Sequence, residues 1–144
     1  MSDAAQITSA KPARPKVPIA ELLGAKSRGW DAESGVMRME YQAKPEFENG
    51  AGAVQGGIIT AMLDNAMSIA LLRQTNFAYG IPTLELKTSY FRAARTGDAL
   101  FGEGRVVHHG KSIAFLEGKL TDAEGRLLAT ASATVKLTPL KKDG

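Results

Sequence analysis

The most apolar part of the chain, residues 58 to 72, repeats with the period of an α-helix. Its apolar residues recur at intervals of three and four and form one wide stripe: Ile58, Ile59, Met62, Leu63, Ala66, Ile69 and Ala70. We predict a helix from Gly56 to about Arg73 or Gln74. The stretch is too short to span a bilayer, and Asp64 and Asn65 interrupt it, so we do not interpret it as a membrane anchor.

After this helix the pattern changes to the two-residue alternation of β-strands. Four strands are predicted, at residues 83–92, 99–108, 112–122 and 127–137, and turns at 109–111 and 122–125 join the last three as hairpins. Before the helix, residues 18–24 predict a short helix, and residues 30–43 predict a strand in which Gly35 marks a turn or bulge. An antiparallel meander with one long helix must wrap that helix with its inner face, which predicts an α+β domain.

The composition excludes several kinds of site. The chain has no cysteine, which rules out disulfides, zinc–thiolate sites, iron–sulfur clusters and thiol nucleophiles. Its two histidines, His108 and His109, are too few for a three-histidine metal site, and we expect no metal. The net charge of +3 comes without a basic run interleaved with aromatics, so we expect no nucleic acid partner; a polyanionic small molecule would suit this charge.

A chain of 144 residues is long enough for one domain. Residues 1–17 are rich in alanine, lysine and proline without an apolar block, and they predict a disordered tail and not a signal peptide. We place a single domain at residues 18–139 and a C-terminal tail at 140–144. We expect a cytoplasmic protein that does not bind membranes.

Asp64 is the one charged residue between Gly56 and Leu72. At about 100° per residue it lies about 160° from the centre of the apolar stripe. Its neighbours on that face are small or apolar, so we expect a partner subunit or a ligand to cover it: Thr60, Ala61, Ser68 and Leu71. Burial would raise the pKa of this carboxyl toward the range useful for a base. The alternative is a structural carboxylate that bonds only to neighbouring backbone or to Asn65.

Gly56 and Gly57 lie where the predicted helix begins. Their N–H groups have no partner within the helix and sit at the positive end of its dipole, which suits a developing oxyanion. The alternative is that the glycine pair only forms a tight turn.

The run from Asn49 to Asp64 (NGAGAVQGGIITAMLD) resembles the signature of PaaI-like hotdog thioesterases. That signature has an asparagine, a His-Gly-Gly six residues later, and an acidic residue nine after the histidine. The segments 83–91 (TLELKTSYF) and 110–115 (GKSIAF) resemble the next strand and hairpin of the family, and the match covers roughly residues 22–137. The resemblance implies a hotdog fold, in which five to six antiparallel strands wrap one long central helix.

The resemblance also implies hydrolysis of an acyl-CoA or aryl-CoA thioester to the free acid and CoA. Asp64 would be the catalytic carboxylate, as general base or nucleophile, and the Gly56 N–H the main oxyanion donor. Asn49 would orient or polarise the thioester, and Thr83 would help to place the water. Gln55 replaces the family histidine; it can donate a hydrogen bond but cannot carry a proton. A thiolate leaving group, with a thiol pKa of roughly 8.5, needs little acid assistance.

No cofactor is implied, because CoA is part of the substrate. Basic residues near strand ends or turns are the candidates for the CoA phosphates, namely Arg92, Arg95 and Lys111. The other expected substrate contacts are Gly57, Met67, Ser68 and Tyr90.

The spacing of Gly56 and Asp64 predicts an oligomeric site. Eight residues of helix separate them by about 12 Å, so they cannot both contact one thioester carbonyl. We therefore expect a homo-oligomer with active sites at the dimer interface, as a homodimer or as a homotetramer built from two dimers.

Two other functions remain open from the sequence. A hotdog enoyl-CoA hydratase or dehydratase usually works with a histidine and an acidic residue, and neither histidine lies near the Asp64 helix in sequence. A non-catalytic acyl-CoA-binding domain is the second alternative, and Gln55 is the residue that favours it.

Overall fold

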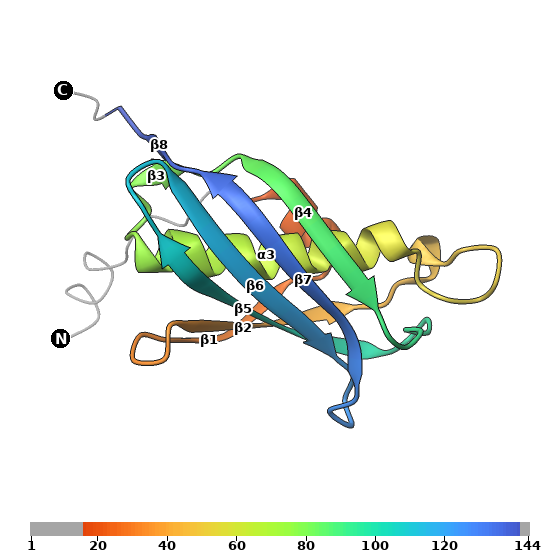
Figure 1. Ribbon diagram of the computed structural model, residues 1–144. Coiled ribbons are helices and arrows are strands. Elements are labelled where there is room, and N and C mark those ends of the chain that lie inside the picture. Colours follow the sequence, from red (N-terminus) through yellow and green to blue (C-terminus); the bar gives the residue numbers. More distant parts are fainter. Residues whose placement is uncertain (1–15, 142–144) are drawn as a thin grey trace, which may run out of the picture.

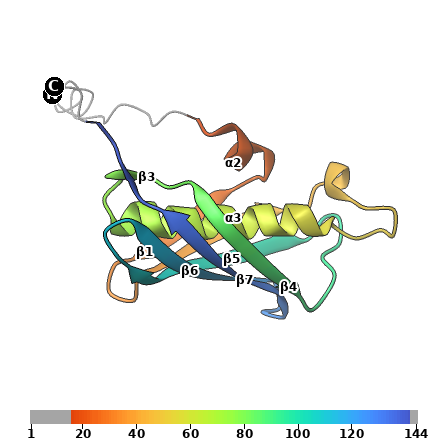
Figure 2. The same cartoon turned by 45° about the horizontal axis from the view of Figure 1, so that its top comes forward.

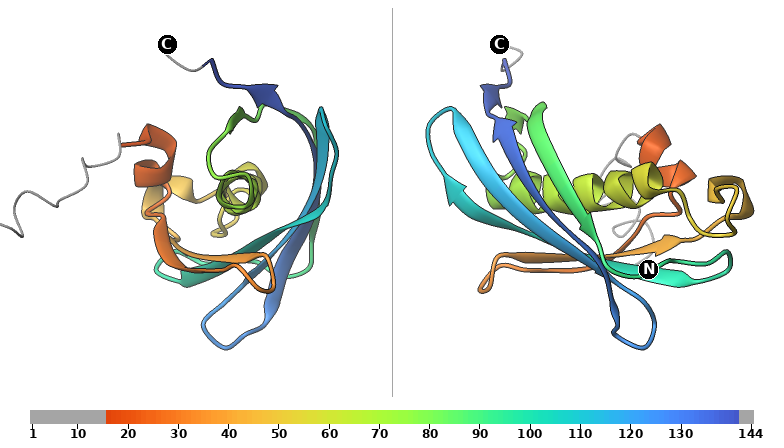
Figure 3. Two further views of the ribbon diagram at one scale, coloured as in Figure 1. Left: turned by 90° about the vertical axis from the view of Figure 1, so that its left-hand side faces the viewer. Right: turned by 45° about the vertical axis from the view of Figure 1, so that its right-hand side comes forward.

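A six-stranded antiparallel sheet wraps around one long helix in the computed structural model, which describes residues 16–141. Figure 3 shows the sheet curving around the helix when the helix is viewed end-on. The helix α3 spans Gly56–Gln74, as predicted. The predicted tails fall mostly on residues 1–15 and 142–144, which lie outside the described range. None of the described helices is long and apolar enough to cross a membrane.

The strand order in the sheet is β1-β2-β5-β6-β7-β4, so β1 and β4 form its two edges (Figure 1). The bounds of these strands are β1 Lys26–Asp31, β2 Val36–Gln42, β4 Thr83–Tyr90, β5 Ala99–His109, β6 Ile113–Thr121 and β7 Leu127–Lys136. Smaller elements are α2 (Pro18–Leu22), a 3-10 turn η1 (Pro45–Phe47), and a short pair between β3 (Tyr79–Gly80) and β8 (Thr138–Pro139). Figure 2 shows α2 and the sheet on opposite sides of α3.

The single strand predicted at residues 30–43 is two strands, and this supplies the sixth strand of the sheet. Asp31 closes the turn between them, because its carboxylate accepts the N–H groups of Glu33 at 3.0 Å and Ser34 at 3.2 Å. Gly35, with φ of +71°, adopts the left-handed conformation that glycine favours. Gly35 therefore marks a chain reversal, and β1 begins upstream of the predicted strand.

The apolar side of α3 packs against the sheet through Ile59, Met62, Leu63, Ala66, Met67, Ala70 and Leu71. Two glycines that face each other on β5 and β6, Gly104 and Gly118, allow the helix to approach closely. A Cβ on Gly104 would lie 2.4 Å from the Ala66 carbonyl oxygen, and one on Gly118 would lie 2.9 Å from Cγ of Met67. This contact fixes the rotation of α3 and leaves Asp64 on its other side.

A buried hydrogen bond ties α3 to β2. Tyr41 is fully buried, and its hydroxyl donates to Oδ1 of Asn65 at 2.8 Å. Burial raises the pKa of the Tyr41 hydroxyl, which therefore stays a donor. Asn65 is thus bonded to the sheet and not to its neighbour Asp64.

Tyr41→Phe is expected to lower the free energy of unfolding by about 1–3 kcal/mol, because Asn65 Oδ1 would lose its donor in a mostly buried place. Urea or thermal unfolding measures this loss. Tyr79→Phe is the matched control, since the Tyr79 hydroxyl has no partner in the described part of the chain. A loss no larger than that of the control would contradict the assignment.

Candidate active site

β4 crosses α3 (Figure 1). Hydroxyl groups of β4 form hydrogen bonds along one face of the helix. We call this contact the polar seam; it consists of Gly56, Thr60 and Asp64 from α3 and Thr83, Thr88 and Tyr90 from β4. β4 runs antiparallel to the helix, so its first residue meets Asp64 and its last meets Gly56. The register of β4 shifts between Thr83 and Glu85, which turns Leu84 outward and lets Thr83 face the helix.

Asp64 is held by a side chain that lies 19 residues away in sequence. The Thr83 hydroxyl donates to Asp64 Oδ1 at 3.1 Å. Among residues 16–141, Oδ2 has no hydrogen-bond partner, and the side chain is half-buried. One carboxylate oxygen is thus oriented by Thr83, while the other is free to receive a water or a substrate atom.

The backbone at the start of α3 leaves two donors free. The Gln55 carbonyl accepts the N–H groups of Ile58 at 2.9 Å and Ile59 at 3.3 Å. The Gln55 N–H donates to the Phe47 carbonyl at 2.8 Å. Within the described range, the N–H groups of Gly56 and Gly57 have no acceptor. The exposed Gln55 side chain does not cap the helix. This helix end can therefore donate to an external acceptor.

Asn49 and Arg95 shape the loop that leads into Gly56. The Asn49 side-chain oxygen accepts the N–H groups of Ala51 at 2.8 Å and Ala53 at 3.1 Å. Arg95 donates from Nη1 to the Gly52 carbonyl at 3.1 Å. The structure thus gives both residues loop contacts, while the Asn49 amide NH₂ and the remaining guanidinium N–H groups of Arg95 are left for a ligand.

The structure does not support Met67 as a substrate contact. Its side chain is fully buried between α3 and the sheet, where it packs beside Gly118. Leu71, expected on the face of Asp64, is also fully buried in the core. The apolar stripe of α3 is therefore wider than expected. Ser68, one turn beyond Asp64, remains half-buried on the face expected from the sequence.

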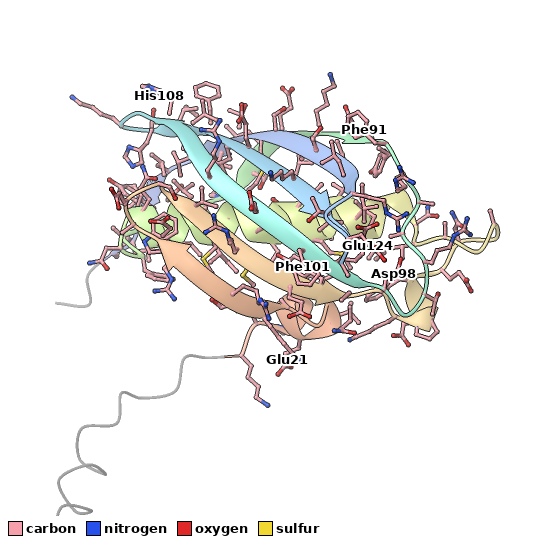
Figure 4. All side chains as sticks on the ribbon, turned by 90° about the horizontal axis from the view of Figure 1, so that it is seen from below. Glu21, Phe91, Asp98, Phe101, His108 and Glu124 are labelled. Carbon is pink, nitrogen blue, oxygen red and sulfur yellow. The ribbon has the colours of Figure 1, made fainter. Side chains whose placement is uncertain are left out.

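The three candidate CoA-binding cations lie at opposite ends of the molecule. Arg92 follows β4 and lies near the Gly56 end, whereas Lys111 lies in the turn between β5 and β6. Figure 4 shows His108, at the end of β5, far from Phe91. Lys111 and Arg92 of one chain therefore lie at opposite ends of the sheet. The two histidines are also at the far end, where the ring of His109 contacts that of Tyr79.

Two residues of the polar seam, Thr60 and Thr88, were not singled out by the sequence analysis as site residues. Thr60 lies one helical turn from both Gly56 and Asp64, and Thr88 lies two residues before Tyr90. Their spacing was visible, but nothing in the sequence paired them. No group of three metal-ligating side chains occurs in the described part of the chain.

An antiparallel sheet wrapped around one long helix defines a hotdog-fold protein. The half-buried carboxylate of Asp64 on that helix defines a candidate hydrolytic site. Residues 51–129 match the profile of the thioesterase superfamily, and the chain belongs to this family. Human acyl-coenzyme A thioesterase 13 is 29% identical over 107 residues, which cover 74% of this chain and 76% of that protein.

Solved structures agree with this assignment. A phenylacetic acid degradation-related protein from Ralstonia eutropha JMP134 superposes with a TM-score of 0.79 at 30% identity, covering 93% of this chain and 98% of that one. The PaaI protein of the phenylacetic acid degradation operon of E. coli has a TM-score of 0.74 at 18% identity, covering 83% of this chain and 87% of that one. The hotdog fold and the PaaI-like resemblance are confirmed, and the protein is a thioester hydrolase.

Proposed function

We propose that the protein hydrolyses acyl-CoA or aryl-CoA thioesters to the free acid and CoA, with Asp64 as the catalytic carboxylate. The observation that carries this proposal is the environment of Asp64: Oδ1 accepts the Thr83 hydroxyl, Oδ2 has no partner among the described residues, and the side chain is half-buried. The activity named for the human relative supports the substrate class.

Two chemical routes fit this geometry. As a general base, Asp64 takes a proton from water, the water oxygen bonds to the acyl carbon, and the carbonyl electrons move onto oxygen. Collapse of that intermediate breaks the carbon–sulfur bond, and the CoA thiolate recovers the proton. As a nucleophile, Asp64 bonds to the acyl carbon and expels the thiolate, and water then hydrolyses the mixed anhydride.

The oxyanion donor in this proposal is the Gly56 N–H of a second copy of the chain. Gly56 and Asp64 of the same chain lie about 12 Å apart along the helix, so they cannot both contact one thioester carbonyl. Two features support pairing between copies. The half-buried face of α3 carries the small side chains of Ala61 and Ser68. On the edge strand β4, the apolar side chain of Leu84 is 57% exposed. We propose a homodimer with two shared sites, and a dimer of dimers as the larger assembly.

Gly56→Pro is expected to lower kcat about 10²-fold, because proline removes the N–H that would stabilise the oxyanion. Proline is tolerated at the first helical position, and Gln55 already has the extended conformation that precedes proline, with ψ of 135°. Gly56→Ala is the matched control: it adds the same Cβ beside the Tyr90 ring but keeps the N–H. Equal rates for the two variants would contradict the oxyanion assignment.

The substrate proposal is tested by thiol release from short-chain, long-chain and aryl CoA thioesters. Release from at least one class, with the matching free acid as product, supports hydrolysis. Loss of the enoyl absorbance of crotonyl-CoA without thiol release would instead indicate a hydratase. Thermal stabilisation by CoA thioesters without any turnover would indicate a non-catalytic binding domain.

A further inference from the structure

The Tyr90 hydroxyl lies at the junction between the sheet and the first turn of α3. It donates to the Gly56 carbonyl at 2.9 Å and lies 2.6 Å from Oγ1 of Thr60. Thr60 in turn donates to Oγ1 of Thr88 at 2.9 Å. Tyr90 is the last residue of β4 and pairs with Ala129 of β7, so the sheet holds its backbone in place. A hydrogen-bonded path therefore connects the sheet to the helix start.

The first turn of α3 has few other restraints. It begins with two glycines, the most flexible residue type, and no side chain caps it. Gly56 joins two peptide planes. The plane before it is held because the Gln55 carbonyl accepts two N–H groups, and the plane after it is held by the Tyr90 hydroxyl on the Gly56 carbonyl. The Gly56 N–H lies in the plane before it, which the Gln55 carbonyl orients. The Tyr90 bond holds the following plane, which carries the Gly57 N–H, so Tyr90 anchors Gly56 from the other side of its Cα.

The Tyr90 ring also covers Gly56. A Cβ at position 56 would lie 3.2 to 3.4 Å from three atoms of the Tyr90 side chain. The ring therefore shields one side of this backbone from water, and a hydrogen bond from an N–H is stronger where water is excluded. The contact also explains why position 56 holds a residue without a side chain.

We propose that Tyr90 is a positioning residue that anchors the first turn of α3 at Gly56 and thereby keeps the Gly56 N–H in the place needed to stabilise the oxyanion, with Thr60 as its partner. The proposal rests on the proposed function of Gly56 as the oxyanion donor. It adds a role to the expected substrate contact of Tyr90, whose hydroxyl bonds to the Gly56 carbonyl and lies beside Thr60 Oγ1.

Tyr90→Phe is expected to lower kcat about 10-fold with KM changed less than about twofold, since a displaced N–H weakens binding of the transition state more than of the substrate. Tyr79→Phe, the same change near the far end of α3, should leave both constants unchanged. Both variants are assayed well below their melting temperatures, so a loss of stability does not mimic the effect. An unchanged kcat for Tyr90→Phe, or a rise in KM alone, would overturn the proposal.

A double-mutant cycle separates this inference from the proposed function. If Tyr90 acts through the Gly56 N–H, then Tyr90→Phe should have little further effect on kcat in the Gly56→Pro background. A full additional 10-fold loss in that background would show that Tyr90 acts elsewhere. If Gly56→Pro itself leaves kcat unchanged, the oxyanion assignment fails first. A large loss in Gly56→Pro with none in Tyr90→Phe rejects only the role of Tyr90.

Discussion

Asp64→Asn is expected to lower kcat by about 10³-fold while the protein stays folded and assembled. The amide has the size of the carboxylate but can neither take a proton from water nor attack the acyl carbon. Its side-chain oxygen can still accept the Thr83 hydroxyl, so the local geometry should survive. Because Asp64 is half-buried and not enclosed, the replacement leaves no deeply buried group without a partner.

The control for this experiment is Asp31→Asn, the same change at a turn carboxylate between β1 and β2. It should leave kcat within about twofold, because nothing in the site contacts it. Binding of free CoA, followed by thermal shift, should be retained in Asp64→Asn. A wild-type rate in this variant would reject Asp64 as the catalytic carboxylate.

The two roles of Asp64 can be separated by isotope labelling. Turnover in H₂¹⁸O by the general-base route places ¹⁸O only in the acid product. By the nucleophilic route, attack of water on the aspartyl side of the anhydride places ¹⁸O in the Asp64 carboxylate. Mass spectrometry of the peptide that contains Asp64 distinguishes these outcomes, and ¹⁸O in that peptide would establish the covalent route.

The parts of the fold that depend on local pattern could be predicted from the sequence. The bounds of α3 follow from its own periodicity and the glycines at its start, and the structure confirms them. Asp64 was conspicuous because it is the one charged residue between Gly56 and Leu72. Its partner Thr83 came only from the family resemblance, and the structure places the two side chains in contact.

The contacts between α3 and β4 could not be predicted, because they depend on a shift in strand register. Simple alternation groups Leu84 with Leu86, Thr88 and Tyr90 on one face. The irregularity after Thr83 changes the phase, so Leu84 is 57% exposed and Thr83 faces the helix. Such a shift is set by pairing with β7, more than 40 residues downstream, and has no local signature in β4.

The close approach of α3 to the sheet could not be predicted from the sequence either. Met67 was expected at the substrate, but it lies fully buried between α3 and the sheet. The paired glycines Gly104 and Gly118 bring the sheet close enough to enclose this side chain as well. Glycines inside strands signal a close backbone approach, but the sequence does not say which helix approaches.

Gly104→Ala tests that close approach, and it is expected to cost about 3 kcal/mol or more of stability. The new Cβ would lie 2.4 Å from the Ala66 carbonyl oxygen and 2.7 Å from Cα of Met67. Both are backbone atoms, so no side-chain rotation relieves the clash, and α3 would have to move away from β5. The melting temperature should fall by about 10 °C or more.

Gly50→Ala is the control for this stability measurement, because a Cβ at Gly50 has no atom within 4 Å. It should leave the melting temperature nearly unchanged. The fraction of Gly104→Ala that folds should also be less active, since the same movement of α3 would displace Asp64 from Thr83 and Gly56 from Tyr90. If both glycine variants melt like the wild type, α3 is not packed as closely on the sheet as the structure indicates, and the polar seam loses its support.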